Sequence, residues 1–336
     1  MKKKIMRRFL FLFLLTIFMT TSATAATTDY MTYAQFVSKR DSFHGPGYDC
    51  LAYANAYTKH VAGVEIKNID KSQMYYTPAE LLPGDVIHIG NPRHPSHWFV
   101  VLDVSSCSGN TINLYTAEGN WPPGKVTISR SAYRVVDNRI FRENEIFTMD
   151  RGYHVINSFY KAAKTCVEPS FYANLYPDLI SQLGTDPDKL YRHFWTHGVA
   201  EGRQASYSYD VKTYISNSDL KKAFNSNYRA ALYHYVTYGW AEKGRKTSEF
   251  FSATYYLDHQ PDVKKAFGSS EKGYLQAAEH FNTFGAPREG RQGISTFSVQ
   301  AYRRNYTDLQ KVFGVNWPDY FLHYLKNGKG EGRKTT

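Results

Sequence analysis

The sequence is poor in cysteine, with three in 336 residues. Small secreted scaffolds held together by disulfides need many more, so we expect this chain to be stabilised by packing. Its 21 Phe and 28 Tyr supply the apolar surface for that packing. Cys107 and Cys166 could form one disulfide, which would leave Cys50 as a single unpaired thiol.

Apolar runs long enough to cross a membrane are also lacking. A basic start over residues 2–8 precedes an apolar run over 9–19, and Ala23, Thr24 and Ala25 form a small-x-small cleavage site. That run is too short for a bilayer core about 30 Å thick. The pattern predicts a cleaved signal peptide over residues 1–25 and a secreted, extracellular protein that can associate with the cell wall.

Acidic side chains are fewer than basic ones, 30 against 41, and the formal net charge is +11. Loss of the signal peptide with its five basic residues leaves +6, most of it within residues 166–336. A mildly basic exported protein is attracted to anionic polymers. On a bacterial surface this means teichoic acids or phospholipid head groups, and we expect an anionic wall polymer or a surface protein as the partner of the C-terminal part. Export argues against nucleic acid, and we expect no stable membrane span. Solubility alone is the other explanation for this charge.

The chain changes character near Cys166. Before it, apolar alternation and Pro/Gly turns indicate strands; after it, helix-length segments rich in aromatics recur. About 310 mature residues suit two domains. We predict an α+β fold, with a first domain over 26–160 and an all-α repeat array over 167–336.

The repeat is defined by a His followed by an aromatic residue, by a Gly five residues after the His, and then by a Glu-Gly-Arg or Glu-Lys-Gly-Arg segment. An aromatic residue and an acidic turn precede these features in each unit. The predicted units are 167–206, 207–248, 249–294 and 295–336, and their defining His and Gly residues are His193 and Gly198, His234 and Gly239, His280 and Gly285, and His323 and Gly328.

One unit illustrates the expected local structure. Pro261 suits a helix first turn, and Gly268 would end that helix. A second helix over 276–284 would end at Gly285 as a left-handed cap. The charges of the Glu-Gly-Arg segments could pair between neighbouring units. The repeated histidines lack a partner at metal-ligand spacing, so we interpret them as half-buried packing residues and predict no metal and no cofactor.

Cys50 follows a turn-rich segment and begins a predicted helix, because Cys50, Ala54, Tyr57 and Val61 share one helical face. A helix N-terminus favours the reactive thiolate, and its N–H groups could hold an oxyanion. The alternative is a buried structural cysteine.

Two predicted strands supply further polar side chains. His97 begins an apolar strand over 97–102, which is apolar on both faces and therefore central. The next strand, over 111–118, places Glu118 on one side, and Asn120 returns to that side. Cys50, His97 and Glu118 or Asn120 then form a nucleophile, a base and an orienting group. His94 is the alternative base, and which of Glu118 and Asn120 is the third member stays open.

These pieces resemble the CHAP amidase family, within the NlpC/P60-like, papain-like superfamily of cysteine amidases and peptidases. The resemblance covers residues 30–158 and is based on the segments Tyr48–Ala54, Pro83–Val86, Ser96–Val101 and Ala117–Trp121. It implies a papain-like domain with an antiparallel sheet and N-terminal helices. It also implies that Cys50 attacks an amide carbonyl, His97 exchanges the proton, Glu118 orients the imidazole and Asn120 assists. The bulky Trp98 and Phe99 after the His depart from the family pattern.

The sequence therefore predicts a cysteine-dependent hydrolase that cleaves amide bonds of peptidoglycan and is positioned by its C-terminal repeats. Two alternatives remain: a surface-binding protein whose hydrolase fold is catalytically degenerate, and a secreted effector amidase with a substrate outside the wall.

Overall fold

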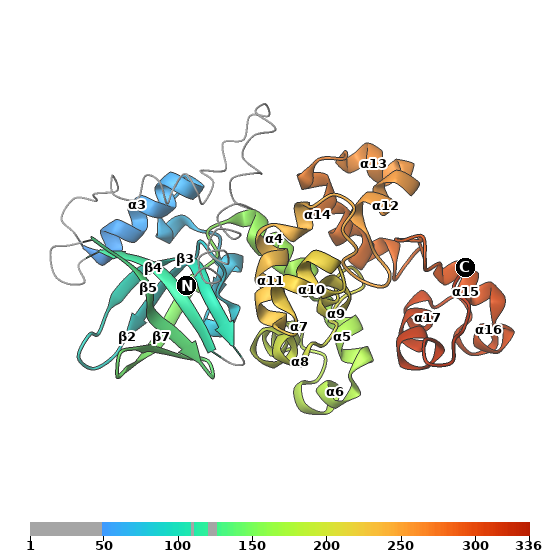
Figure 1. Cartoon of the computed structure of the whole chain (residues 1–336), viewed down its shortest axis with the longest axis horizontal. Helices are drawn as coiled ribbons and strands as arrows, with labels where there is room; N and C mark the ends of the chain where they lie inside the picture. The colour runs from blue at the N-terminus through green and yellow to red at the C-terminus, as the bar shows by residue number, and fades with distance from the viewer. Residues whose placement is uncertain (1–48, 109–110, 120–125) are drawn as a thin grey trace.

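The computed structural model describes residues 49–108, 111–119 and 126–336. The predicted signal peptide lies outside these residues. The chain is α+β: an antiparallel barrel is followed by many short helices, as Figure 1 shows from left to right. The fold class and the helical nature of the C-terminal repeats are confirmed.

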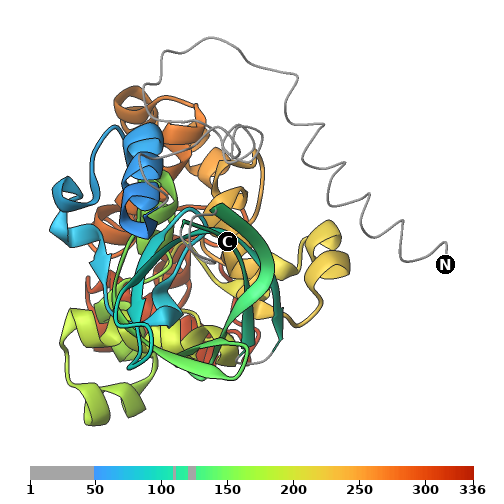
Figure 2. The ribbon, with the colours of Figure 1, turned by 90° about the vertical axis from the view of Figure 1, so that its left-hand side faces the viewer.

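Seven strands form the barrel, in the order β1-β7-β2-β3-β4-β5-β6, and a further pairing of β6 with β7 closes it. All neighbouring pairs are antiparallel. Figure 2 looks into the closed ring. The strands are β1 (Met74–Tyr75), β2 (Val86–Gly90), β3 (His97–Ser108), β4 (Thr111–Gly119), β5 (Val126–Val136), β6 (Arg139–Arg142) and β7 (Glu145–Tyr153).

Helix α3 (Cys50–Ala62) covers the outer face of the barrel over β3 and β4. Its buried side chains include Ala54, Tyr57 and Val61, as the helical periodicity predicted. They pack against the outward-facing Val100 and Ala117 in one cluster. Three short 3-10 turns, η2 (Ile66–Asn68), η3 (Lys71–Gln73) and η4 (Pro78–Glu80), lead from α3 to the barrel.

The opposite faces of β3 and β4 point into the barrel. Phe99 and Val101 of β3 and Ile112 and Leu114 of β4 are buried there, and Glu118 follows them at the same parity. The strand beginning at His97 is central, as predicted, because it pairs with both β2 and β4. This alternation turns the side chains of residues 97 and 118 to the inside of the barrel at its rim, where β3 begins and β4 ends.

The disulfide considered between Cys107 and Cys166 does not form, because all three cysteines are free. Cys107 lies on β3, whereas Cys166 follows α4 (Asn157–Thr165) and donates to the Ala162 carbonyl oxygen at 3.4 Å. Both thiols are buried, and burial raises the pKa of each. They act as small apolar packing groups.

Each repeat unit has three short helices, where the sequence analysis described two. The additional helix, which was not predicted, comes first in each unit and contains the aromatic residue that recurs in all four units. The units are α5 (Pro169–Leu175), α6 (Pro177–Leu183) and α7 (Pro187–His193); α9 (Val211–Ile215), α10 (Ser218–Phe224) and α11 (Tyr228–Thr237); α12 (Ala253–His259), α13 (Pro261–Phe267) and α14 (Glu271–His280); and α15 (Val299–Asn305), α16 (Thr307–Phe313) and α17 (Trp317–His323).

A turn follows the last helix of each unit. It is a π-turn in η5 (Phe194–Gly198), η7 (Phe281–Gly285) and η8 (Tyr324–Gly328), and a 3-10 turn in η6 (Gly239–Ala241); the short helix α8 (Val199–Glu201) continues η5. The second unit is therefore the irregular one. It is also the unit with an extra residue in its Glu-Lys-Gly-Arg segment.

The repeated histidine bonds to the tyrosine of the first helix in its own unit. The hydroxyl-to-Nδ1 distances are 3.0 Å for Tyr172–His193, 2.7 Å for Tyr214–His234, 2.9 Å for Tyr256–His280 and 2.9 Å for Tyr302–His323. Burial lowers the pKa of all four imidazoles, so the neutral ring accepts a hydrogen bond from the tyrosine hydroxyl. The packing interpretation of these histidines therefore agrees with the structure.

The glycine five residues after each histidine makes room for that tyrosine. A Cβ at Gly285 would overlap the hydroxyl oxygen of Tyr256, and the other three units show the same overlap. Gly285 was predicted to be a left-handed cap, and this is wrong. Its φ is not positive; the glycines of this unit with a positive φ are Gly268, at the end of α13, and Gly290, in the Glu-Gly-Arg segment.

Gly285→Ala should therefore destabilise the protein by about 3 kcal/mol, because Tyr256 is fully buried and its hydroxyl cannot move aside. Adding Tyr256→Phe, which removes the clashing oxygen, should recover part of that loss. The control is Gly330→Ala, whose added Cβ would meet nothing closer than the Asn327 oxygen at 3.4 Å. Urea unfolding checks the three variants; equal midpoints for Gly285→Ala and Gly330→Ala would contradict the steric explanation.

The arginine of each Glu-Gly-Arg segment pairs within its own unit, not between units. Arg291 bonds to Asp262 at the start of α13 and to Glu289 two residues before it. The same triplet recurs as Arg203 with Asp178 and Glu201, Arg245 with Asp219 and Glu242, and Arg333 with Asp308 and Glu331. Each triplet ties the end of a unit to its second helix.

The units form a compact group and not an open stack. The first two share one apolar cluster with the inside of the barrel, and the last two form a second cluster that Phe171 and Tyr207 join from the first two units. Helix α17 of the fourth unit contacts α5 of the first. Tyr207 lies 5.2 Å from Phe321 between ring centroids, and Lys326 donates to the Asn174 carbonyl oxygen.

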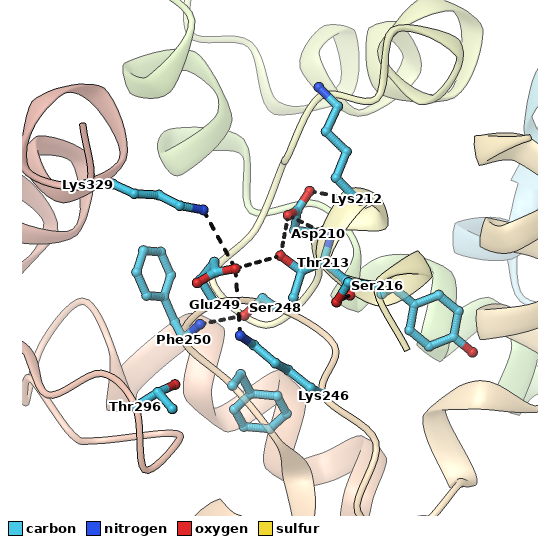
Figure 3. Close-up of polar contacts among 12 residues, drawn as sticks. Asp210, Lys212, Thr213, Ser216, Lys246, Ser248, Glu249, Phe250, Thr296 and Lys329 are labelled. Atoms are coloured by element: carbon cyan, nitrogen blue, oxygen red, sulfur yellow. Dashed lines mark hydrogen bonds and ion pairs between the residues drawn. The ribbon is translucent and has the colours of Figure 1, made fainter. Parts of the chain in front are cut away.

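A carboxylate adds a polar link between the second and fourth units. Glu249 lies 3.6 Å from both Lys246 and Lys329, and it accepts from the Thr213 hydroxyl at 3.4 Å (Figure 3). Lys329 follows η8, whereas Thr213 belongs to α9. These partly exposed pairs add little stability, so the aromatic cluster is the main link between the units.

Candidate active site

Cys50 is the first residue of α3, at the point where that helix meets the barrel rim. Asp49 caps the helix, and its carboxylate accepts the Leu51 N–H at 2.7 Å. Gly119 at the end of β4 lies against this cap, since an added Cβ would come within 3.1 Å of the Asp49 carbonyl oxygen and 2.9 Å of the Tyr53 Cβ. Close packing at Gly119 thus brings the start of α3 beside the end of β4.

The thiol of Cys50 also lies beside the start of β3. The Trp98 amide N–H lies close enough to the sulfur to favour its charged form. The Trp98 nitrogen is bonded to the carbonyl carbon of His97, so the sulfur lies one peptide group away from that residue. Cys50 is half-exposed, whereas Cys107 and Cys166 are buried.

His97 and Glu118 meet at the same rim. The imidazole Nε2 lies 2.7 Å from Glu118 Oε2, and the two side chains are only 3% and 0% exposed. A carboxylate on one imidazole nitrogen fixes the ring orientation and stabilises a proton on it. Nδ1 is then the nitrogen that can exchange a proton with a thiol. The structure therefore pairs His97 with Glu118 and places the Cys50 sulfur beside the Trp98 amide, the next residue along β3.

Tyr133 and Arg142 complete the surroundings of Glu118, and the sequence analysis missed both. The Tyr133 hydroxyl donates to Glu118 Oε2 at 2.9 Å, and Arg142 donates to the two carboxylate oxygens at 3.1 and 2.9 Å. Arg142 also donates to the Tyr133 hydroxyl at 2.6 Å and lies over its ring. Burying a carboxylate requires such compensation, and the Tyr133 and Arg142 donors supply it beside His97.

Asn120, the fourth predicted residue, lies outside the described residues, as does Tyr48. Of the alternatives weighed from sequence, His94 faces Glu145, with 3.7 Å between Nε2 and the carboxylate. It lies in the loop before β3 and is exposed. His97 is the histidine that meets Glu118.

The thiol differs from the sequence expectation in its acidity. The pKa of Cys50 is raised, mainly by burial and further by the neighbouring Asp49 carboxylate, although the Trp98 and Leu51 N–H groups oppose this. Asp49 also occupies the Leu51 N–H that an oxyanion would need. The resting group is therefore a thiol at neutral pH, and its activation requires transfer of the proton to a base.

Replacing Asp49 by asparagine should lower the pKa of Cys50, because it removes a negative charge and keeps a good helix cap. At any pH below that pKa more thiolate is present, so iodoacetamide should react faster and the rate profile should move to lower pH. Asp70→Asn is the matched control, since Asp70 caps η3 in the same way and does not act on Cys50. An unchanged profile in Asp49→Asn would contradict the electrostatic assignment.

His88, which the sequence analysis left unmarked, neighbours the site on the outer face. Its ring stacks on Trp98 with centroids 4.5 Å apart, and its nitrogens bond to Asp150 and Ser96 at 2.9 Å each. The alternation of β2 and β3 places His88 and Trp98 opposite each other on one face. The two rings form a flat surface next to Cys50 and His97.

In the described part of the chain, no group of three or more His, Cys, Asp or Glu residues is arranged so that it could hold a metal ion. Within the same residues, none of the helices has both the length and the apolar character needed to cross a membrane.

Comparison of the chain with family models, with curated proteins and with solved structures found no match.

Proposed function

We propose that this chain is a secreted cysteine amidase or peptidase of the CHAP type, with a papain-like domain, and that it hydrolyses amide bonds of peptidoglycan. The observation that carries the proposal is the meeting of the Cys50 helix start, His97 and Glu118 at one rim of the barrel. These groups come from three separate elements, and a structural cysteine would not require an imidazole held in place by a buried carboxylate next to it.

The reaction follows from the roles of these groups. His97 Nδ1 takes the proton of the Cys50 thiol, and the sulfur forms a bond to the amide carbonyl carbon. The C–N bond then breaks as His97 returns the proton to the leaving amine, which leaves a thioester. Water attacks the thioester with His97 as base, and the acid product leaves as the thiol is restored. Glu118 keeps the imidazole oriented and stabilises its protonated form.

The repeats would hold the enzyme at the wall. Lysines on the exposed side of the second helix recur in units two to four, as Lys221 and Lys222, Lys264 and Lys265, and Lys311. Cations in this regular arrangement suit an anionic wall polymer better than scattered surface charge does. A signal peptide over residues 1–25 would deliver the protein there.

One observation favours the binding-protein alternative. The raised pKa of Cys50 means that the thiol is not activated at rest, as in a catalytically degenerate site. The amidase proposal is preferred because the buried His97–Glu118 pair supplies the base that such a thiol needs.

The test is product analysis on purified walls and defined muropeptides, with the same protein blocked by iodoacetamide as control. We expect turbidity to fall and new amino groups to appear only with the unblocked protein. A protein mixture is tested in parallel for the effector alternative. Equal results with blocked and unblocked protein, or wall binding without new amines, would reject the amidase proposal.

A further inference from the structure

A cavity of about 140 Å³ lies where the barrel meets the first repeat unit, far from Cys50 along β4. Ile112 at the beginning of β4 lines it, whereas Glu118 of the active site lies near the end of that strand. Buried Ala79, Ile112 and Val135 form its apolar wall, and Asp137 and His197 lie on its exposed rim. The cavity thus joins two parts of the chain and opens to solvent.

Arg229 is the unusual residue of this cavity. It lines the cavity from the first turn of α11 and is only 6% exposed. Its Nη2 donates to the Trp195 carbonyl oxygen at 2.9 Å, and the Tyr233 hydroxyl lies beside the guanidinium. Its Nε and Nη1, however, have no hydrogen-bond partner within the described part of the chain.

A buried guanidinium with two unused donors is costly, so this site calls for a water, an ion or a ligand that completes it. No carboxylate forms an ion pair with Arg229 among the described residues. Cys107 nearby is neutral, because burial raises its pKa to about 12. Nε–H and one N–H of Nη2 point the same way, and this fork matches the two oxygens of a carboxylate. The missing partner is therefore best supplied by a carboxylate that enters the cavity from solvent.

The other residues that line the cavity restrict the chemical class of the ligand further. Asp137 places a carboxylate at the mouth, which would repel a phosphate and attract an ammonium group. The apolar wall of Ala79, Ile112 and Val135 suits a short aliphatic side chain. We propose that this cavity binds a small zwitterionic α-amino acid, with Arg229 holding the carboxylate and Asp137 the ammonium group.

Calorimetric titration of the full chain tests this site with three probes: alanine, propionate and inorganic phosphate. Propionate is alanine without its amino group, so the pair measures the contribution of Asp137. We expect alanine to bind about tenfold or more tightly than propionate, and phosphate to bind least. Equal binding of alanine and propionate, tighter binding of phosphate, or no binding of any probe at millimolar concentration would each overturn the proposal.

Three variants, one at Asp137 and two at Arg229, assign the contacts. Asp137→Asn should bind alanine and propionate equally. It should fold, because Asp137 has a φ of 49° in the β5–β6 turn, a conformation that asparagine also adopts. Arg229→Met should lose alanine binding, and Arg229→Lys, which keeps the charge without the fork, should weaken it by about tenfold. Unchanged affinity in Arg229→Lys and Asp137→Asn would overturn the assignment even if Arg229→Met failed to fold.

Discussion

Replacing Cys50 by alanine should reduce amide hydrolysis at least about 10⁴-fold, because the variant has no group that can form the thioester. The fold should be unaffected, since Cys50 is half-exposed and alanine is a good helix former. The measurement is the rate of amine release from muropeptides. Binding to walls through the repeats should be retained, which separates chemistry from attachment.

Cys107→Ala is the matched control for this loss. Cys107 is buried in the barrel, so its replacement removes a sulfur from the protein without touching the rim. We expect its rate to stay within about twofold of wild type and its stability to fall by about 1 kcal/mol. Iodoacetamide should label one thiol per chain in wild type and in Cys107→Ala, and none in Cys50→Ala. If Cys50→Ala still hydrolysed the amide bond, the Cys50 sulfur would have no role in the reaction.

The active-site residues could be predicted where they follow local patterns. The spacing of Ala54, Tyr57 and Val61 predicted that Cys50 begins a helix, and the alternation along residues 111–118 predicted that Glu118 lies on one side of its strand. Tyr133 and Arg142 follow no such pattern. They reach Glu118 because β5 and β6 complete the ring through the β6–β7 pairing, and closure of a barrel is a long-range property that alternation along one strand does not encode.

The repeats show the same division. The recurrence of Tyr, His and Gly located all four units, because these residues contact each other within about two dozen positions. The return of α17 to α5 was not predictable, since it depends on Tyr207 and Phe321, which belong to different units. Arg229 was not predicted either. A single arginine on a helix is normally exposed, and its burial here depends on the packing of the barrel against that helix.

Glu118→Gln should lower the hydrolysis rate by about 10³- to 10⁴-fold. Glutamine has the same size and can still accept from Tyr133 and Arg142 through its amide oxygen. It carries no negative charge, however, so it cannot stabilise the imidazolium that forms when His97 takes the thiol proton. Because Glu118 touches His97 and not the substrate, the loss should fall on kcat, with KM little changed.

Tyr133→Phe distinguishes this positioning effect from general damage to the buried network. It removes one donor from Glu118 at 2.9 Å and leaves the His97–Glu118 contact in place. We expect it to cost about 1–2 kcal/mol in unfolding free energy, while the hydrolysis rate falls less than about tenfold. The rate of Cys50 alkylation at neutral pH supplies a second readout. It should fall in Glu118→Gln, because the imidazole then holds the thiol proton less well, and it should stay near wild type in Tyr133→Phe. If both variants lost activity in proportion to their stability, Glu118 would be a structural carboxylate, and the orientation of His97 would have to come from another group at the rim.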